Sequence, residues 1–500
     1  MSAYGDWEPV IGLEVHAQLL TETKLFCGCA TSFGDPPNTH TCPVCLGLPG
    51  ALPVLNGEAL RLAVTVGLAL GCRIARRSLF ARKNYFYPDL PKGYQISQYE
   101  EPLCLDGALE IEGDGGPKRV RIRRAHVEED AGKNLHGASA LALAGGAADG
   151  EESIVDLNRA GTPLVEIVSE PDLRSPAEAR DYLKRLRELC VFVGANDGNL
   201  EQGSFRADAN VSVRRRGDEA LGTRVELKNL NSFRFVEDAI DGEVRRQIAL
   251  RERGEPVRQQ TRGWAADKKQ SYLLRDKEGD AGYRYFPEPD LPPLSVDELF
   301  VAQVAASLPE LPDQKRARFV EEYGLTPQAA AVMTGHPRLA AFFEEAVLSG
   351  GSHAELEGNA VATANFIQSE VLRDAVFEGL DARFAVTARQ VADVLRLVAD
   401  HRISGKQAKE VYAALRGTDR TAESIVAERG MEVVGDRAAL EKLARALVRE
   451  HAGQAEKYRK GKTALLGFFV GQLMKQTRGS ADPALANEVV KACLAEPPGD

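Results

Sequence analysis

The chain has 500 residues, of which 44% are hydrophobic and 27% charged, proportions typical of a soluble globular protein with room for about three domains. It contains no apolar run long enough to cross a membrane, so membrane-spanning classes are excluded. Its net charge of −10 excludes a protein whose whole surface binds nucleic acid, but it permits a local basic patch.

Residues 11–18, IGLEVHAQ, predict a strand whose apolar side chains alternate with Glu14 and His16. Successive side chains of a strand point to opposite faces, so this strand has one face for a core and one polar face. SFRADANVSVR and TRVELKN repeat the alternation, which predicts a largely antiparallel sheet that is packed on one side and open on the other. The density of charged and amide groups favours a polar cradle for an ionic substrate, although an ordinary solvent face shows the same alternation. The candidate substrate- or nucleotide-binding residues on these strands are Arg206, Asp208, Asn210, Glu226 and Lys228.

Four of the eight cysteines lie between residues 27 and 45, as C-x-C, twelve residues and C-x-x-C. The N-terminal residues, MSAYGDWEP, do not resemble a signal peptide and predict a cytoplasmic protein, in which clustered cysteines are metal ligands more often than disulfides. The pattern predicts a tetrahedral zinc site formed by Cys27, Cys29, Cys42 and Cys45. Four sulfurs leave no position for water, so the ion would be structural; the alternative is a reduced, metal-free loop of the same shape.

The segment RKNYFYPDLPKGYQISQ (82–98) is interpreted as a loop punctuated by proline and glycine, and it carries Lys83, Asn84 and Tyr85. A lysine beside aromatic rings is able to position a phosphate, and the rings are able to stack on an adenine. Aromatic side chains of loops also pack without any ligand, so nucleotide binding is one of two interpretations.

The sequence HVEED (126–130) adds Glu128 and Glu129 to the polar groups Glu14 and His16. Carboxylates with one imidazole suit Mg²⁺ or Mn²⁺, hard ions that accompany nucleotide phosphates. Only one of Glu128 and Glu129 can face the same way on a strand, so both need not bind the ion. The alternative is a structural cluster of ion pairs.

Four prolines within residues 287–293 place a domain boundary near residue 294, beyond which alanine- and leucine-rich segments have helical periodicity. The helical pattern breaks and restarts at HRISGKQAK, and the low-complexity tract 136–153 predicts a surface loop. SPAEARDYLKRLRELC predicts a structural helix with one apolar stripe. We therefore predict an α+β protein with a cradle domain that includes the zinc site (1–294), an all-α domain (295–405) and a small helical tail domain (406–500).

The segment between residues 451 and 480 carries six positive side chains against Glu456 alone, a charge of +5 within an acidic chain. Such asymmetry indicates a polyanionic partner, although a solvated helix face has a similar composition. The six are Lys457, Arg459, Lys460, Lys462, Lys475 and Arg478.

Seven segments carry a family likeness: IGLEVHAQL, KNYFYPDLPKGYQISQ, HVEEDAGK, DLNRAGTPLVEIVSEPD, EQGSFRADANVS, ELKNLNSF and YRYFPEPDLPPL. In this order they resemble the B subunit of the tRNA-dependent aspartyl/glutamyl amidotransferase, and the likeness runs essentially from end to end. The chain is similar to the bacterial type, because PEPDLPPLS leads directly into helices without a further domain. It lacks the common phosphate-binding loops and any amidase-type stretch, so its nucleotide chemistry would use an unusual site.

The resemblance implies a ligase that uses ATP and Mg²⁺ to phosphorylate the side-chain carboxylate of mischarged Glu-tRNA(Gln) or Asp-tRNA(Asn). Ammonia from glutamine hydrolysis on a separate A subunit would then form the amide, with a small C subunit completing a heterotrimer. Glu14, His16 and Glu128 or Glu129 match the metal-binding positions of the family, and Lys83 matches a lysine beside the ammonia channel. The four clustered cysteines match a structural zinc site present in many members. The tail would bind tRNA, with Lys457, Arg459, Lys460 and Lys462 contacting its backbone.

Overall fold

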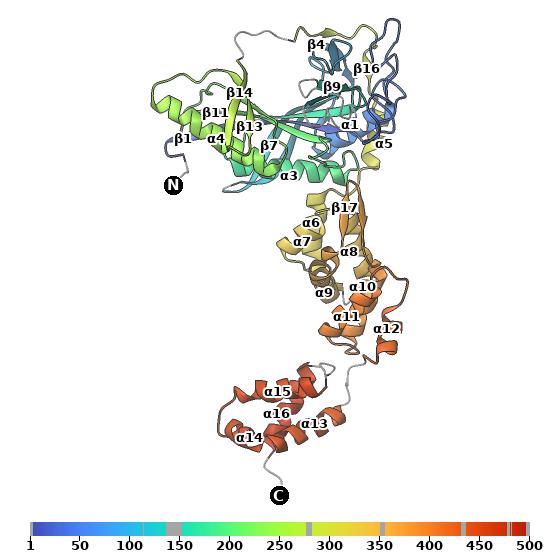
Figure 1. Cartoon of the computed structure of the whole chain (residues 1–500), viewed down its shortest axis with the longest axis vertical. Coiled ribbons are helices and arrows are strands. Elements are labelled where there is room, and N and C mark those ends of the chain that lie inside the picture. The colour runs from blue at the N-terminus through green and yellow to red at the C-terminus, as the bar shows by residue number, and fades with distance from the viewer. Residues whose placement is uncertain are drawn as a thin grey trace. The chain divides into compact units, whose positions relative to one another are not determined.

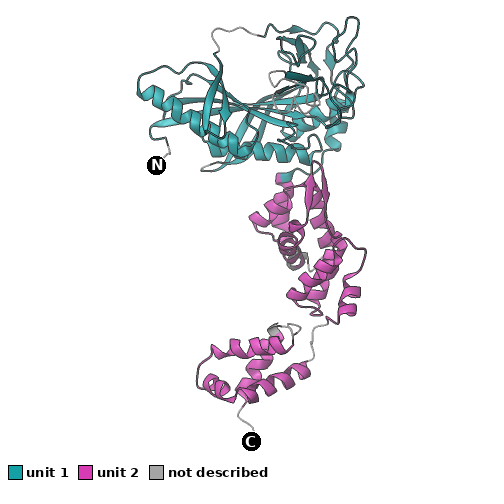
Figure 2. Cartoon of the chain, viewed as in Figure 1, with its two compact units in different colours: residues 1–312 teal, residues 313–500 magenta. Residues whose placement is uncertain are grey.

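The computed structural model describes residues 4–113, 115–136, 153–276, 283–350, 356–431, 437–477, 481 and 483–496. The chain divides into two compact units, residues 1–312 and 313–500 (Figure 2). Residues 137–152 of the predicted surface loop and Arg478 of the basic segment lie outside the described residues. The predicted three-domain division with boundaries near 294 and 405 stays a prediction.

A nine-stranded sheet forms the centre of the first unit (Figure 1). All of its neighbouring strands are antiparallel except β12 and β13, which are parallel. The α+β fold class and the largely antiparallel sheet are therefore confirmed. In spatial order its strands are β14 (Gln270–Asp276), β13 (Gln260–Ala265), β12 (Val225–Lys228), β11 (Phe205–Arg215), β1 (Trp7–Gln18), β10 (Pro163–Ser169), β7 (Gly116–Glu129), β6 (Cys104–Gly113) and β2 (Arg73–Ile74).

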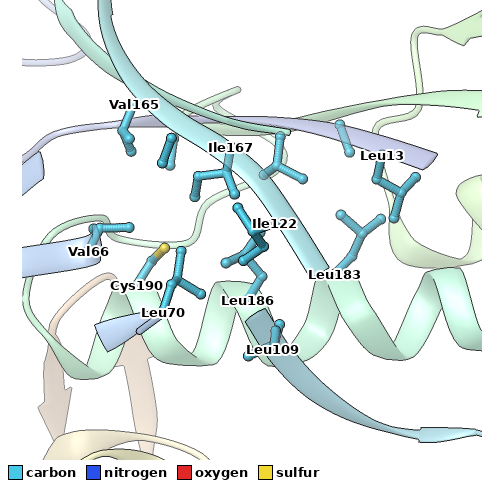
Figure 3. Packing of buried hydrophobic residues seen from close by; sticks show 14 of the residues in the cluster. Leu13, Val66, Leu70, Leu109, Ile122, Val165, Ile167, Leu183, Leu186 and Cys190 are labelled. Carbon is cyan, nitrogen blue, oxygen red and sulfur yellow. The ribbon is translucent and has the colours of Figure 1, made fainter. Parts of the chain in front are cut away.

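The apolar face of this sheet packs against helices α1 (Gly57–Ala69), α3 (Pro176–Phe192) and α4 (Phe233–Glu252). Leu13 of β1 and Ile167 of β10 meet Leu183 and Leu186 of α3 in the core (Figure 3). The predicted structural helix is thus α3; the side chain of Ser175 caps it by accepting a hydrogen bond from the backbone N–H of Glu178, 3.2 Å away. Because this face is filled, the alternating polar side chains of the same strands must lie on the opposite face.

A smaller sheet covers one end of that polar face, so the face is not bare along its whole length. It consists of β15 (Phe286–Pro287), β4 (Ala81–Asn84) and β5 (Tyr94–Ser97). The Oγ of Ser97 on β5 donates a hydrogen bond to Glu128 Oε2 of β7 over 2.9 Å, which joins the two sheets across the predicted site. The remaining elements of the first unit are β3 (Arg77–Ser78) paired with β16 (Leu294–Ser295), β8 (Lys133–His136) paired with β9 (Ser153–Asp156), and α5 (Glu298–Ala306).

The described residues of the second unit are helical apart from one short hairpin. One helix ends at Ala399, and a capping box formed by Ser404 starts the next at Gly405, as the break at HRISGKQAK predicts. A separate apolar cluster gathers residues between Leu440 and Leu494. None of the helices within the described ranges is long and apolar enough to span a membrane. The elements are α6 (Pro312–Tyr323), α7 (Pro327–Met333), α8 (Pro337–Ser349), α9 (Leu356–Ser369), the 3₁₀ helix η2 (Val371–Arg373), β17 (Val376–Glu378), β18 (Asp381–Arg383), α10 (Ala388–Ala399), α11 (Gly405–Leu415), α12 (Ala422–Arg429), α13 (Arg437–Glu450), α14 (Ala452–Arg459), α15 (Leu465–Gln476) and α16 (Pro483–Ala495).

Candidate functional site

Three side chains on neighbouring strands form a compact cluster on the polar face: His16 of β1, Glu166 of β10 and Glu128 of β7. One donor atom from each lies within 4.8 Å of the other two. The Nε2 atom of His16 is 3.4 Å from Glu166 Oε2 and 3.6 Å from Glu128 Oε1. The predicted meeting of an imidazole with a carboxylate of the HVEED segment is therefore present in the structure.

Strand register explains this convergence. His16 lies directly opposite Glu166 in the β1–β10 pair, and Glu166 lies directly opposite His126 in the β10–β7 pair. Directly opposed residues of an antiparallel pair share a face and approach to about 5 Å. Glu128 follows His126 by two residues, so it joins the same face.

Glu166 is the member of the cluster that the sequence prediction did not include. It lies in PLVEIVS, a short run that reads as a buried strand, and a single carboxylate inside such a run was the available signal. His126 is also buried here, with its Nε2 3.6 Å from both Glu128 Oε2 and Glu166 Oε2. Its Nδ1 is buried and has no hydrogen-bond partner among the described residues.

The electrostatics keep both carboxyl groups of the cluster ionised. Burial and the charge of Glu166 raise the pKa of Glu128, but His126, Lys83 and His16 outweigh them and leave it below its ordinary value. Burial also opposes ionisation of Glu166, yet the same three side chains hold its pKa well below the ordinary range. Burial lowers the pKa of His16, and its hydrogen bond to Glu166 more than compensates, so the net shift is upward. Two anions and an imidazole therefore occupy one small, largely dry area.

Of the alternatives Glu128 and Glu129, the structure brings Glu128 into the cluster. The carboxylate of Glu129 points away from it, forms an ion pair with Lys92, and accepts a hydrogen bond from the backbone N–H of Ile96 over 2.9 Å. Glu14 lies beside the cluster and outside its three donors, with its Oε1 accepting a hydrogen bond from Asn210 Nδ2 over 3.0 Å. Burial, with repulsion from Glu166, raises the pKa of Glu14.

Lys83 and Asn84 belong to strand β4, so their predicted loop position is wrong. Burial lowers the pKa of Lys83, but the charges of Glu128 and Glu166 outweigh it and raise the pKa overall. The Lys83 ammonium lies 5.0 Å from the centre of the Tyr283 ring. The alternation of β4 was hidden because Pro88, Pro91 and Gly93 follow it so closely.

Asn84 and Tyr85 contact the segment before β15 in the structure. The side-chain amide of Asn84 donates to the carbonyl of Arg284 over 2.7 Å, which ties this segment to β4. The Tyr85 ring lies edge-on to Tyr283, with the ring centres 5.8 Å apart. Tyr283, Asn84 and Tyr85 thus line the side of the cluster on which Lys83 lies.

The polar face continues beyond Glu14 onto β11 and β12. Asn210 lies opposite Glu226, and Lys228 Nζ contacts Asp208 Oδ2 at 2.7 Å and Glu226 Oε1 at 3.2 Å. Arg206 has a different role, because its guanidinium makes a two-pronged contact with Asp130 over 2.9 and 3.0 Å. Burial raises the pKa of Asp130, but Arg159 and Arg206 outweigh it and lower that pKa to about 2. The predicted cradle residues therefore lie along one continuous strip.

The four predicted zinc ligands converge at a separate place. One sulfur atom from each of the four cysteines lies within 4.8 Å of the others, and the sulfurs of Cys42 and Cys45 are 3.9 Å apart. A tetrahedral zinc ion with bonds of about 2.3 Å requires separations of roughly 3.8 Å. A hydrogen bond with Cys27 lowers the pKa of the Cys45 thiol to about 4. The geometry and the donor set fit a four-sulfur zinc site.

In the tail, the four predicted tRNA-binding side chains lie at the end of α14 and just beyond it, and all are exposed. Two of them already have protein partners: Arg459 Nε donates to the carbonyl of Leu494 over 2.9 Å, and Lys460 Nζ pairs with Glu456 Oε1 over 2.5 Å. Lys457 and Lys462 remain the better candidates for contacts with an external polyanion.

Two family models match most of the chain and identify it as a subunit of the GatB/GatE class. Residues 9–302 match the family model described as "GatB/GatE catalytic domain", and residues 341–494 match "GatB domain". Two proteins named as the B subunit of aspartyl/glutamyl-tRNA(Asn/Gln) amidotransferase, from Thermodesulfovibrio yellowstonii and Halorhodospira halophila, are 49% and 52% identical to the chain. Each alignment covers 98% of this chain, and it covers 100% and 99% of the respective relative. The chain therefore belongs to the B-subunit family of the aspartyl/glutamyl-tRNA amidotransferases.

Proposed function

We propose that this chain activates the side-chain carboxylate of a glutamate or aspartate esterified to tRNA, by transferring the γ-phosphate of ATP to it. As a member of the B-subunit family, it acts in the glutamine-dependent ligase that converts mischarged Asp-tRNA(Asn) or Glu-tRNA(Gln) to Asn-tRNA(Asn) or Gln-tRNA(Gln). The proposed activation step rests on one observation: the cluster of His16, Glu128 and Glu166 lies beside the Lys83 ammonium.

The donor set of this cluster fits a hard divalent cation. Two carboxylates and one imidazole, close together and largely buried, suit Mg²⁺ or Mn²⁺ with positions left for water and phosphate oxygens. When bound, such an ion offsets negative charge on the phosphoryl group in transfer. Glu14 lies on the same face of β1 as His16, and we assign it the supporting role of orienting a water molecule or the amino acid beside the ion.

The side chains of the protein supply the rest of the environment. A free carboxylate reacts poorly with ammonia because oxide is a poor leaving group, whereas phosphate leaves readily. The Lys83 ammonium attracts the carboxylate or phosphate oxygens, and Asn84 and Tyr85 hold the wall on which it lies. We assign the nucleotide or aminoacyl group to the adjoining strip of Asp208, Asn210, Glu226 and Lys228, which Arg206 borders.

Ammonia for the second step would come from a glutaminase A subunit, with a C subunit completing a cytoplasmic heterotrimer. The helical part, residues 295–405, and the tail, residues 406–500, would hold the tRNA, chiefly through Lys457 and Lys462. A chain truncated after Met431 loses the whole apolar cluster between Leu440 and Leu494. We expect the complex with this truncated chain to have a higher KM for tRNA and to retain its glutaminase activity. If tRNA affinity and glutaminase activity were lost to the same extent, the tail would not be devoted to tRNA.

The four-cysteine cluster would bind a structural zinc ion. With all four positions taken by sulfur, the ion has no site for substrate, and its role would be to fix a segment that has almost no regular structure. Metal analysis of the purified chain, with and without Cys42→Ser, tests this assignment directly.

The activation step is tested by ATP cleavage that depends on mischarged tRNA, measured in the complex reconstituted with A and C subunits. Glu128→Gln should abolish this cleavage and reduce Mn²⁺ binding measured by electron paramagnetic resonance. Glu110→Gln, which alters an exposed carboxylate on β6, is the matched control and should leave both unchanged. Wild-type ATP cleavage in Glu128→Gln would instead favour a tRNA-binding scaffold without catalysis of its own.

A further inference from the structure

Lys24 carries a fully buried ammonium group that has no carboxylate partner. The side chain is 0% exposed, and its Nζ atom donates to the backbone carbonyls of His40 over 2.5 Å and of Leu157 over 3.2 Å. Its remaining contact is Cys45 Sγ, at 3.7 Å. Within the described ranges no Asp or Glu oxygen pairs with Lys24. Carbonyl oxygens orient an ammonium but carry no net charge, so the sulfur of Cys45 is the contact of Lys24 that can supply a counter-charge.

A buried, unpaired ammonium is strongly unfavourable, because burial removes its hydration. Such a group is kept in a fold when an anion lies beside it. The anion next to Lys24 is the four-cysteine cluster: four thiolates around one divalent ion carry a net charge of −2. Lys24 also contacts the other half of the cluster, since its backbone N–H donates to the carbonyl of Cys29 over 2.9 Å.

We infer that Lys24 is the buried charge partner of the metal-loaded cysteine cluster, a positioning residue that raises its affinity for zinc. The inference rests on the zinc site proposed above. The hydrogen bond from Lys24 to Leu157 also connects the zinc site to the catalytic sheet. Arg159, two residues after Leu157, forms an ion pair with Asp130 next to β7. Gly161, with a φ of +89°, lies against Lys24 and Cys45 where a Cβ would sit 3.4 Å from the lysine Cδ atom.

Lys92 provides a matched control inside the same cavity of about 190 Å³, which both lysines line. Its side chain is largely buried, at 8% exposed, but its ammonium pairs with the carboxylate of Glu129. Loss of either lysine removes one buried positive charge, and only the loss of Lys24 removes the charge that touches a cluster sulfur.

The test measures zinc affinity of the full-length chain by competition with a chromophoric chelator under reducing conditions. Lys24→Met should weaken zinc binding about 10- to 100-fold, the range for groups that support metal ligands, and Lys24→Arg should restore most of it. Lys92→Met should leave zinc affinity within about threefold of wild type. Equal affinity of Lys24→Met and wild type would overturn the inference. A wild-type chain that binds no zinc would overturn the zinc site itself, so the two failures are distinguishable.

A measurement on the wild-type chain covers the case in which Lys24→Met does not fold. Acetylation by acetic anhydride is mapped by mass spectrometry with and without zinc, and Lys92 serves as the internal reference. Lys24 should be protected in the zinc-loaded chain and should become reactive when the metal is chelated, while Lys92 changes little. If Lys24 were equally protected in the zinc-loaded and the metal-free chain, the charge of the cluster would not keep the lysine in place, and the inference would be wrong.

Discussion

The His16–Glu128–Glu166 cluster and the four-cysteine cluster lie in the same unit, but different parts of the architecture form them. Three neighbouring strands hold the first, whereas turns and bends with almost no regular structure hold the second. The first offers three donor atoms, which would leave positions on an ion for other ligands, and the second offers four sulfurs, which would fill the shell of one. A rigid sheet can keep carboxylates close together without a metal, so that cluster is suited to chemistry. A loop of thiols that holds the proposed zinc ion would depend on it for shape.

The largest effect is expected from Glu166→Gln, in the cluster that the three strands hold. Removing one anion from the strand-held cluster should lower the transamidation rate of the reconstituted complex at least about 1,000-fold, because the charge acts on the phosphoryl transfer itself. The variant should still fold, but with lower stability, because His16, His126 and Lys83 lose the anion that they stabilise in the wild type. A cooperative unfolding transition at a lower melting temperature than wild type, alongside lost activity at 20 °C, is the expected pair of results; near-normal activity would remove Glu166 from the site.

Lys83→Met tests the charge that faces the same cluster from β4. We expect the transamidation rate to fall about 100-fold, with Mn²⁺ affinity unchanged or higher because a neighbouring positive charge has gone. Steady-state rates and Mn²⁺ titration of the variant separate these two effects. A loss of Mn²⁺ binding as large as the loss of rate would mean that Lys83 only supports the fold of β4.

Cys42→Ser should have the opposite signature to Glu166→Gln. It should remove bound zinc, lower the melting temperature of the first unit by several degrees, and reduce the rate at 20 °C by less than about tenfold. Zinc content, calorimetry and activity are measured on one preparation. Lost activity in a folded variant of unchanged stability would show instead that the cysteine cluster takes part in catalysis.

The smallest effect is expected from Asp130→Asn, which removes the carboxylate that pairs with Arg159 and Arg206. In the folded wild type the pKa of the Asp130 carboxyl group is about 2, below the ordinary value of 3.8. The charge of Asp130 therefore stabilises the fold at every pH above 3.8, and this stabilisation is lost as the pH falls toward 2. The difference corresponds to about 2 kcal/mol at pH 7. Urea unfolding followed by the two tryptophans, both in the first unit, should show the variant destabilised by this amount from pH 7 to 5, with the gap narrowing below pH 4. If the difference in the free energy of unfolding between variant and wild type did not depend on pH, the effect would come from packing and not from charge.

The sequence predicted the features that strand periodicity and cysteine spacing encode locally. Alternation in IGLEVHAQ placed Glu14 and His16 on one face, and the C-x-C and C-x-x-C pairs located the cysteine cluster. Glu166 was missed because β10 is apolar around it, and its role depends on lying opposite His16 in a strand some 150 residues away. The choice between Glu128 and Glu129 likewise needed the register of β7 against β10. Pairing between distant strands is set by the whole core and leaves no local pattern.

The strand that carries Lys83 has a consequence for biosynthesis. On one side β4 pairs with β5, only some ten residues away, but on the other side it pairs with β15, where Arg82 lies opposite Phe286. At about 5–20 residues per second, a ribosome needs roughly 10–40 s to add the 204 residues from 82 to 286. During that interval one edge of the lysine-bearing strand lacks its neighbour, so the three-stranded sheet beside the His16–Glu128–Glu166 cluster is completed late, when the first unit is nearly all made.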